Sequence, residues 1–155
     1  MSKVIAITGP TGAGKTSVAE ALTKKISTFV NIDVDHLKHM NPNALTRIVK
    51  SAGDDDWPYS SWELLGENVA LLTNNFLKHG YDVVINGWLE VESWKEIDKQ
   101  ININHRIILL PDIETNKQRD AGRTEQVKMG EKAVERGHKY FSSTDYYNNF
   151  TRLES

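Results

Sequence analysis

The residues best suited to chemistry lie near the amino terminus, in the run Gly9-Pro10-Thr11-Gly12-Ala13-Gly14-Lys15-Thr16. It fits the pattern G-x-x-x-x-G-K-[ST], in which glycines let the backbone curl until successive N–H groups point at one anion. Lys15 adds a positive charge that reaches β- and γ-phosphates, and the Thr16 hydroxyl is placed to bind Mg²⁺. The run therefore predicts a site for ATP and Mg²⁺. The predicted contacts are Gly9, Thr11, Gly12, Ala13, Gly14, Lys15, Thr16 and Ser17.

The sequence on either side of this run has the patterns of a strand and a helix. Val4-Ile5-Ala6-Ile7 is an unalternating apolar run, typical of a strand buried on both faces of a parallel sheet. After the run, Val18, Ala19, Leu22 and Ile26 recur at helical spacing. The alternative is a glycine-rich turn that simply caps a helix, but a chance match to the whole pattern is rare in a chain of this length.

Two carboxylates follow the next predicted strand. The short strand covers 29–32, and Asp33-Val34-Asp35 comes at its carboxyl end. Open α/β sheets bind their ligands at that edge, so the pair is placed where ligand groups are expected. The alternatives are that both are ordinary loop residues, or that Asp33 caps the following helix.

The rest of the chain alternates predicted helices and strands. A short helix and an irregular segment are expected over 41–60, before an amphipathic helix that closes at Gly80. Strands separated by helices predict an α/β fold with a parallel sheet covered on both faces. The further expected strands are 81–85, 105–110 and 140–143, and the further expected helices are 92–99, 113 towards 122, and 124 to about 136.

Composition excludes several classes of protein. The 155 residues suit one domain, and 19 Lys and Arg against 21 Asp and Glu give no general attraction for nucleic acid or anionic membranes. The chain has no cysteine, so disulfide frameworks and thiolate zinc sites are excluded. No apolar run is long enough for a signal peptide core or a membrane span, and a cytoplasmic location fits best.

Several stretches taken in order resemble the P-loop small-molecule kinases, above all gluconate-kinase-like and chloramphenicol-phosphotransferase-like proteins. Shikimate and nucleoside kinases and the polynucleotide 5′-kinase domain are more distant. The resemblance implies a three-layer α/β/α fold, a five-stranded mostly parallel sheet of order 2-3-1-4-5, and a single domain over 1–155 with a lid around 119–136. It also implies transfer of the γ-phosphoryl group of Mg-ATP to a hydroxyl group of a small molecule. The stretches are 7–16, 32–35, 57–58, 82–86 and 119–123.

The resemblance implies roles for residues outside the phosphate loop. An aspartate just after the second strand accepts the proton of the attacking hydroxyl in such kinases, which points to Asp35, with Asp33 second. Asn86 cannot supply the negative charge that relatives often carry after the third strand, so magnesium is expected to bind Asp33 or Asp35. Lid arginines fold over the phosphates, and Arg119 and Arg123 occupy that place, with Arg119 also able to stack on adenine. Thr144 lies in the loop expected to flank the adenine. The alternative for the arginines is a solvated basic turn.

Departures from the family pattern leave two rival functions open. Asn86 stands where relatives often carry an acid, and the chain stops at Ser155 where relatives continue into a further helix, so a nucleotide-binding module without phosphotransfer is one rival. A polynucleotide 5′-kinase is the other. Its basic strip would consist of Lys117, Arg119, Arg123, Lys128 and Lys132, diluted by Asp120, Glu125 and Glu131.

Weaker patterns each have two interpretations. Trp88 and Glu90 follow the third strand, where they contact substrate or cover the core. His36 and His39 have the spacing of metal ligands, although a solvated pair is the commoner case. The segment 54–59, rich in Asp and aromatic residues, lines an acceptor pocket or forms a solvated loop.

Overall fold

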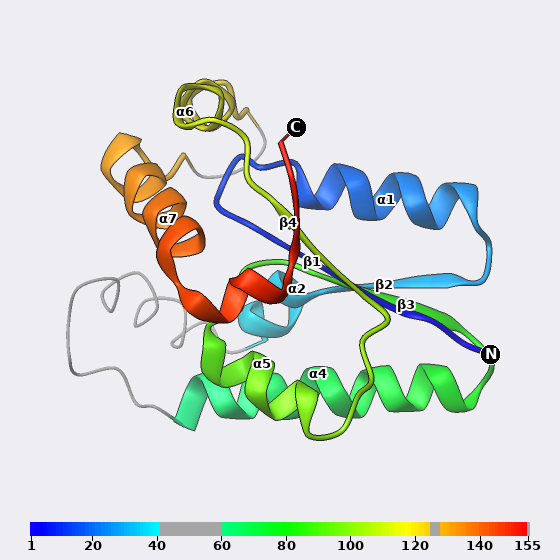
Figure 1. Ribbon diagram of the computed structural model, residues 1–155. Helices are drawn as coiled ribbons and strands as arrows, with labels where there is room; N and C mark the ends of the chain where they lie inside the picture. Colours follow the sequence, from blue (N-terminus) through cyan, green and yellow to red (C-terminus); the bar gives the residue numbers. More distant parts are fainter. Residues whose placement is uncertain (41–59, 125–127, 155) are drawn as a thin grey trace.

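The computed structural model describes residues 1–40, 60–124 and 128–154, which fold around one sheet (Figure 1). All of its strand pairs are parallel, and the strand order is β2-β3-β1-β4-β5. The α/β class and the strand order predicted from the sequence are confirmed. The strands are β1 (Val4–Thr8), β2 (Phe29–Asp33), β3 (Asp82–Asn86), β4 (His105–Leu109) and β5 (Thr151–Leu153).

Helices cover both faces of this sheet. In Figure 1, α1 lies on one side of the strands, and α4 and α5 lie on the other. Within the described parts of the chain, every helix is too short or too polar to cross a membrane. The helices are α1 (Lys15–Lys25), α2 (Val34–His39), α4 (Ser60–Lys78), α5 (Val91–Asp98), α6 (Ile113–Ala121), α7 (Glu131–Ser143) and the 3₁₀-helix η1 (Asp145–Asn149).

The apolar strands are unalternating because each face of the sheet has its own core. Val83 and Ile85 on β3 belong to the larger cluster beneath α4 and α5, whereas Val84 between them belongs to the smaller cluster beneath α1. Successive side chains of a strand point to opposite faces, so a strand covered on both sides needs apolar residues at every position. Full burial of such a side chain contributes roughly 1.5–3 kcal/mol.

The strand predicted at 140–143 is wrong, because α7 runs through these residues to Ser143. Tyr140 and Phe141 suit a strand locally, but Val134, Gly137 and Phe141 are buried at the spacing of a helix and pack on the core. The polar helix predicted from Thr124 therefore begins later, at Glu131, and also ends later. The last strand is β5, and Thr144 precedes it.

Candidate active site

The phosphate loop joins β1 to α1, and its shape depends on glycine. Gly9, Gly12 and Gly14 all have positive φ. A Cβ on Gly9 would lie 2.2 Å from the main-chain oxygen of Leu109, and one on Gly12 would lie 2.9 Å from that of Asn116. The loop is therefore held between β4 and α6, and other residues at these two positions would force it open.

The start of α1 is open to an anion. Gly14 is its N-cap residue, no side chain caps the helix, and its first turn contains no acidic residue. The unpaired N–H groups and the positive end of the helix dipole are thus directed into the loop. A polyphosphate fits this donor set, because it brings negative oxygens to several N–H groups at once.

Lys15 places a cation inside the loop, where its Nζ donates to the carbonyl oxygen of Pro10 at 2.8 Å. Burial lowers the pKa of Lys15 to about 8; the Asp35 carboxylate opposes that effect, and the charges of Lys38 and Arg123 add to it. Burial thus disfavours the ammonium form of Lys15, and the oxygens of a bound triphosphate would stabilise that form.

The two predicted carboxylates have different surroundings. Asp33 is the N-cap residue of α2, since its Oδ1 accepts from the backbone N–H of Asp35 at 3.0 Å, so the capping interpretation is confirmed. Asp35 lies in the first turn of α2, and its side chain is 61% exposed. Partial burial raises the pKa of Asp35, but the ammonium groups of Lys38 and Lys15 outweigh it and keep the pKa below its usual value.

The loop after β3 fixes the position of α2. Gly87 has a φ of 139°, and a Cβ there would lie 2.1 Å from Cγ2 of the buried Val34. Asn86, only 1% exposed, donates from Nδ2 to Oδ1 of Asn31 at 2.6 Å. Asn86 therefore holds β3 to β2 with its amide.

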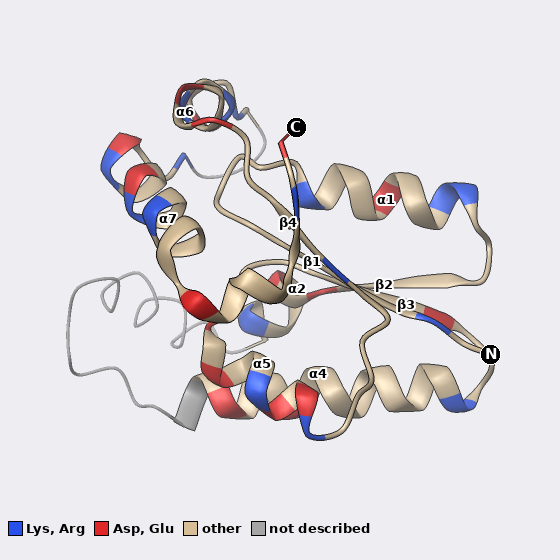
Figure 2. Cartoon of the chain, in the orientation of Figure 1, with Lys and Arg blue, Asp and Glu red and all other residues tan. Residues whose placement is uncertain are grey.

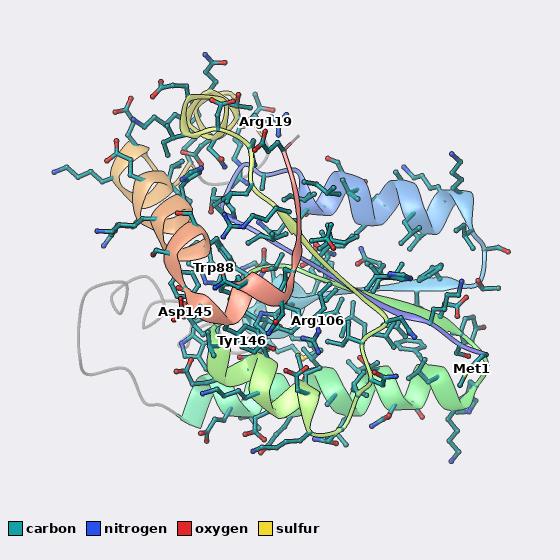
Figure 3. The ribbon with its side chains drawn as sticks, in the orientation of Figure 1. Met1, Trp88, Arg106, Arg119, Asp145 and Tyr146 are labelled. Atoms are coloured by element: carbon teal, nitrogen blue, oxygen red, sulfur yellow. The ribbon has the colours of Figure 1, made fainter. Side chains whose placement is uncertain are left out.

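Two arginines lie close to the phosphate loop. Nη1 of Arg119 is 4.0 Å from the position that a Cβ on Gly14 would take, and Figure 3 labels Arg119 at α6, in whose last turn it lies. Arg123 lowers the pKa of Lys15, so its charge also reaches the loop. Arg119 lies on α6, whereas Arg123 follows the end of this helix at Ala121.

Asp120 organises the segment after α6. It is buried and accepts from the backbone N–H groups of Met129 and Gly130, at 3.0 and 2.9 Å. Its Oδ1 also lies 3.9 Å from Nη1 of Arg123. One carboxylate thus holds the start of α7 and the second arginine near the same point.

Trp88 packs against α7 (Figure 3). Its ring stacks on Tyr140 with centroids 5.7 Å apart, and its Nε1 donates to Oε1 of Glu90 at 3.1 Å. A Cβ on Gly137 would lie 2.9 Å from the Trp88 ring and 3.5 Å from Cβ of Pro10. Trp88 therefore covers the core and packs on α7, and Gly137 brings α7 close to Pro10 of the phosphate loop.

Comparison with known proteins identifies the family. The model of the Zeta toxin family matches residues 2–109. The chain belongs to the Zeta toxin family. The match includes the phosphate loop, both carboxylates and the loop after β3, whereas α6, α7 and β5 follow the matched range. No curated protein sequence matches the chain.

Solved structures place this Zeta toxin family member among P-loop kinase folds. It is similar to a sugar kinase from Janibacter sp. HTCC2649, with a TM-score of 0.73, 12% identity, and coverage of 100% of this chain and 85% of that one. A gluconokinase from Sinorhizobium meliloti 1021 gives a TM-score of 0.67 at 17% identity, covering 98% and 81%. The Pnkp1/Rnl/Hen1 RNA repair complex gives 0.66 at 17% identity, covering 95% of this chain and 45% of that one. The predicted P-loop small-molecule kinase-like family is confirmed.

Some predicted contacts of this Zeta toxin family member remain predictions or concern residues outside the described ranges. Thr144 is the N-cap residue of η1 and precedes the last strand, and its contact with adenine stays a prediction. The acceptor-pocket hypothesis for 54–59 concerns residues outside the described ranges. Over 1–40, 60–124 and 128–154, no three His, Asp or Glu side chains gather into a site that could hold a metal ion by protein ligands alone.

Sequence reasoning missed two residues that support the site. Asn116 donates from Nδ2 to the carbonyl oxygen of Thr11 at 2.7 Å and so supports the phosphate loop from α6. Nothing in the sequence around Asn116 indicates this contact, because its partner lies 105 residues away. Lys38 contacts Asp35 at 3.3 Å, and its position three residues after Asp35 on a predicted helix was an available signal.

Proposed function

We propose that this Zeta toxin family member is an ATP-dependent phosphotransferase that moves the γ-phosphoryl group of Mg-ATP to a hydroxyl group of a small molecule. One observation carries the proposal: the charges of Asp35 and Arg123, from two separate segments, both act on Lys15 inside the phosphate loop. Such a cluster would supply a cation for the phosphates, an acceptor for the hydroxyl proton and a second cation from the proposed lid.

Each residue has a definite role in this proposal. The loop N–H groups and Lys15 bind the β- and γ-phosphate oxygens, and Arg119 and Arg123 neutralise charge on the transferring group. Asp35 accepts or orients the hydroxyl proton of the acceptor, and its lowered pKa keeps it a carboxylate at neutral pH. Catalysis is then positioning plus electrostatic stabilisation.

Magnesium needs few protein ligands in this proposal. Mg²⁺ would supply positive charge that neutralises the phosphates. It usually keeps several waters and takes one or two protein oxygens, for which Thr16 and Asp33 are the proposed groups. One oxygen of Asp33 already caps α2, which fixes the orientation of that carboxylate.

The lid is proposed for residues around 119–136, within a single domain over 1–155. Its described parts carry both arginines and the Asp120 contacts to Met129 and Gly130. A lid that brings Arg119 and Arg123 over the phosphates would exclude water from the reacting group.

A screen of hydroxyl compounds, monitored by ADP release, tests the proposal. Sugars, polyols, nucleosides and aminoglycosides form the panel, and Lys15→Ala supplies the background rate. ADP release that requires one compound and Lys15 would support phosphotransfer. Binding of Mg-ATP without turnover on any compound would favour a nucleotide-binding module instead.

The salt dependence of acceptor binding separates a polynucleotide 5′-kinase from a small-molecule kinase. Lys117, part of the proposed basic strip, lies 2.7 Å from Glu135 and 3.7 Å from Glu114, so its charge is already paired. Figure 2 shows acidic and basic segments interleaved on α6 and α7. We therefore favour a small acceptor, and an oligonucleotide acceptor would reveal itself by an affinity that falls steeply with salt.

A further inference from the structure

Lys38 is a buried lysine beside the candidate base. It lies on α2, its side chain is 8% exposed, and its Nζ is 3.3 Å from Oδ1 of Asp35. The same Nζ donates to the carbonyl oxygen of Trp88 at 2.5 Å and lies 5.4 Å from the ring centroid of Trp62. Three segments thus meet at one ammonium group: α2, the start of α4 and the loop after β3.

A buried ammonium group is costly unless its charge and its N–H groups are satisfied. Two acceptors and one aromatic face surround Lys38, and the carboxylates of Glu90 and Asp33 add further attraction. Lysine on a short exposed helix would ordinarily point to water, so the burial has to be explained by these partners. Together these contacts hold α2, which carries Asp35, against the loop that follows β3.

The tied loop follows β3 at the carboxyl edge of the sheet, beside the end of β2 from which Asp35 follows. The Trp88 carbonyl is in the segment between β3 and α5, and Trp88 itself contacts α7. A shift of this loop would therefore move the surroundings of Asp35, unless Lys38 holds the two together. The contact through a main-chain oxygen is independent of the side chain at position 88.

We propose that Lys38 is a positioning residue, a clamp that holds Asp35 and the loop after β3 together as one wall of the acceptor site. The clamp itself stands on geometry alone, whereas its effect on turnover rests on the proposed phosphotransfer. Lys38 acts through Asp35, orienting the carboxylate towards the acceptor hydroxyl. It makes no proposed contact with phosphate.

Amide hydrogen exchange of the full chain tests the clamp without any assay of activity. In Lys38→Met we expect amide exchange to rise at least about fivefold, both in peptides that cover 34–40 and in peptides that cover 87–92. Either segment can then open without breaking the contacts that Lys38 makes between them. Lys38→Arg keeps a cation and should restore most of the protection. Lys38→Gln, which keeps a donor but no charge, serves if Lys38→Met does not fold. Unchanged exchange in both segments would overturn the proposal.

Kinetics then test whether the clamp serves catalysis, with the acceptor from the screen or with water as acceptor. We expect Lys38→Met to lower kcat about 10- to 100-fold while KM for ATP changes less than about twofold, with recovery in Lys38→Arg. In an Asp35→Asn background the same substitution should have little further effect. Equal losses of kcat and of ATP binding, or full additivity with Asp35→Asn, would contradict a positioning role. A wild-type protein without turnover would refute the phosphotransfer, and the exchange result would still decide the clamp.

Discussion

At the scale of single residues, Lys15 and Asp35 share one electrostatic environment. Lys15 is a lysine whose pKa is lowered to about 8, whereas Asp35 is an acid whose pKa is also lowered. The two shifts have different causes: burial dominates at Lys15, and neighbouring ammonium groups outweigh burial at Asp35. Around pH 7 the site therefore holds a cation and an anion in the protonation states that phosphotransfer requires.

The pKa of Lys15 predicts how nucleotide affinity depends on pH. Bound phosphate favours the ammonium form of Lys15, so the affinity for Mg-ATP is highest below pH 8 and falls as the pH rises above that value. We expect Mg-ATP to bind about tenfold more weakly at pH 9 than at pH 7, since only about a tenth of Lys15 is then protonated. Calorimetric titrations at the two pH values measure this. Lys15→Arg, which stays charged, is the control, and an equal pH dependence in that variant would contradict the assignment.

Asp35→Asn tests the proposed base. The amide keeps the size of the side chain but accepts no proton, so we expect kcat on the true acceptor to fall about 10²- to 10⁴-fold. KM for ATP should change little, because Asp35 is assigned no phosphate contact. Steady-state kinetics at pH 7.5 provide the measurement, and a loss of turnover smaller than about threefold would show that another group is the base.

At the scale of elements, the site depends on two close approaches between segments. The start of α2 packs on Gly87 with no room for a Cβ, and α7 packs on Trp88 and Pro10 through Gly137. Gly87 allows α2 to pack on the loop after β3, and Gly137 allows α7 to pack on that loop and on the phosphate loop. The position of the carboxylates on α2 therefore depends on a residue more than fifty positions away in the sequence.

Gly87→Ala should be strongly destabilising. The new methyl group would lie 2.1 Å from Cγ2 of Val34, in a backbone conformation with a φ of 139°. Overpacking and strain together predict a loss of about 2–4 kcal/mol in the free energy of unfolding. Gly80→Ala is a matched control, because φ is +83° but no atom lies within 4 Å of the added Cβ. Urea unfolding of both variants measures the difference, and equal losses would refute the close packing.

The elements also show what sequence could and could not predict. The phosphate loop and β1 were predictable because their pattern is local and contiguous. The strand predicted at 140–143 failed because the packing of Phe141 on the core, a tertiary effect, decides the conformation there. The roles of Lys38 and Asn116 were not predicted, because their main partners are the main-chain oxygens of Trp88 and Thr11, 50 and 105 residues away. Every residue has a main-chain oxygen, so a sequence pattern cannot indicate which one a side chain contacts.

At the scale of the whole molecule, one edge of the sheet collects the candidate site. The parallel order β2-β3-β1-β4-β5 puts every strand's carboxyl end on the same side, so the loops after β1, β2 and β3 and the helix after β4 meet there. A ligand bound at that edge would contact segments from most of the chain. Its binding should therefore stabilise the fold as a unit.

Thermal unfolding measures this coupling. With Mg-ATP at about 100 times its Kd, linkage predicts roughly 2.7 kcal/mol of added stability. For a chain of this size that corresponds to a rise in Tm of about 5–10 °C. Lys15→Ala should show little or no rise under the same conditions. A wild-type protein with unchanged Tm at saturating Mg-ATP would contradict nucleotide binding by the native fold.

The stacking of Trp88 on Tyr140 makes the molecule optically informative. An indole that shares its surroundings with a helix emits light according to how closely that helix approaches. A variant in which phenylalanine replaces the other three tryptophans would carry one indole, packed on α7. Its emission after rapid mixing with nucleotide would follow the motion of α7 in real time, without any attached dye.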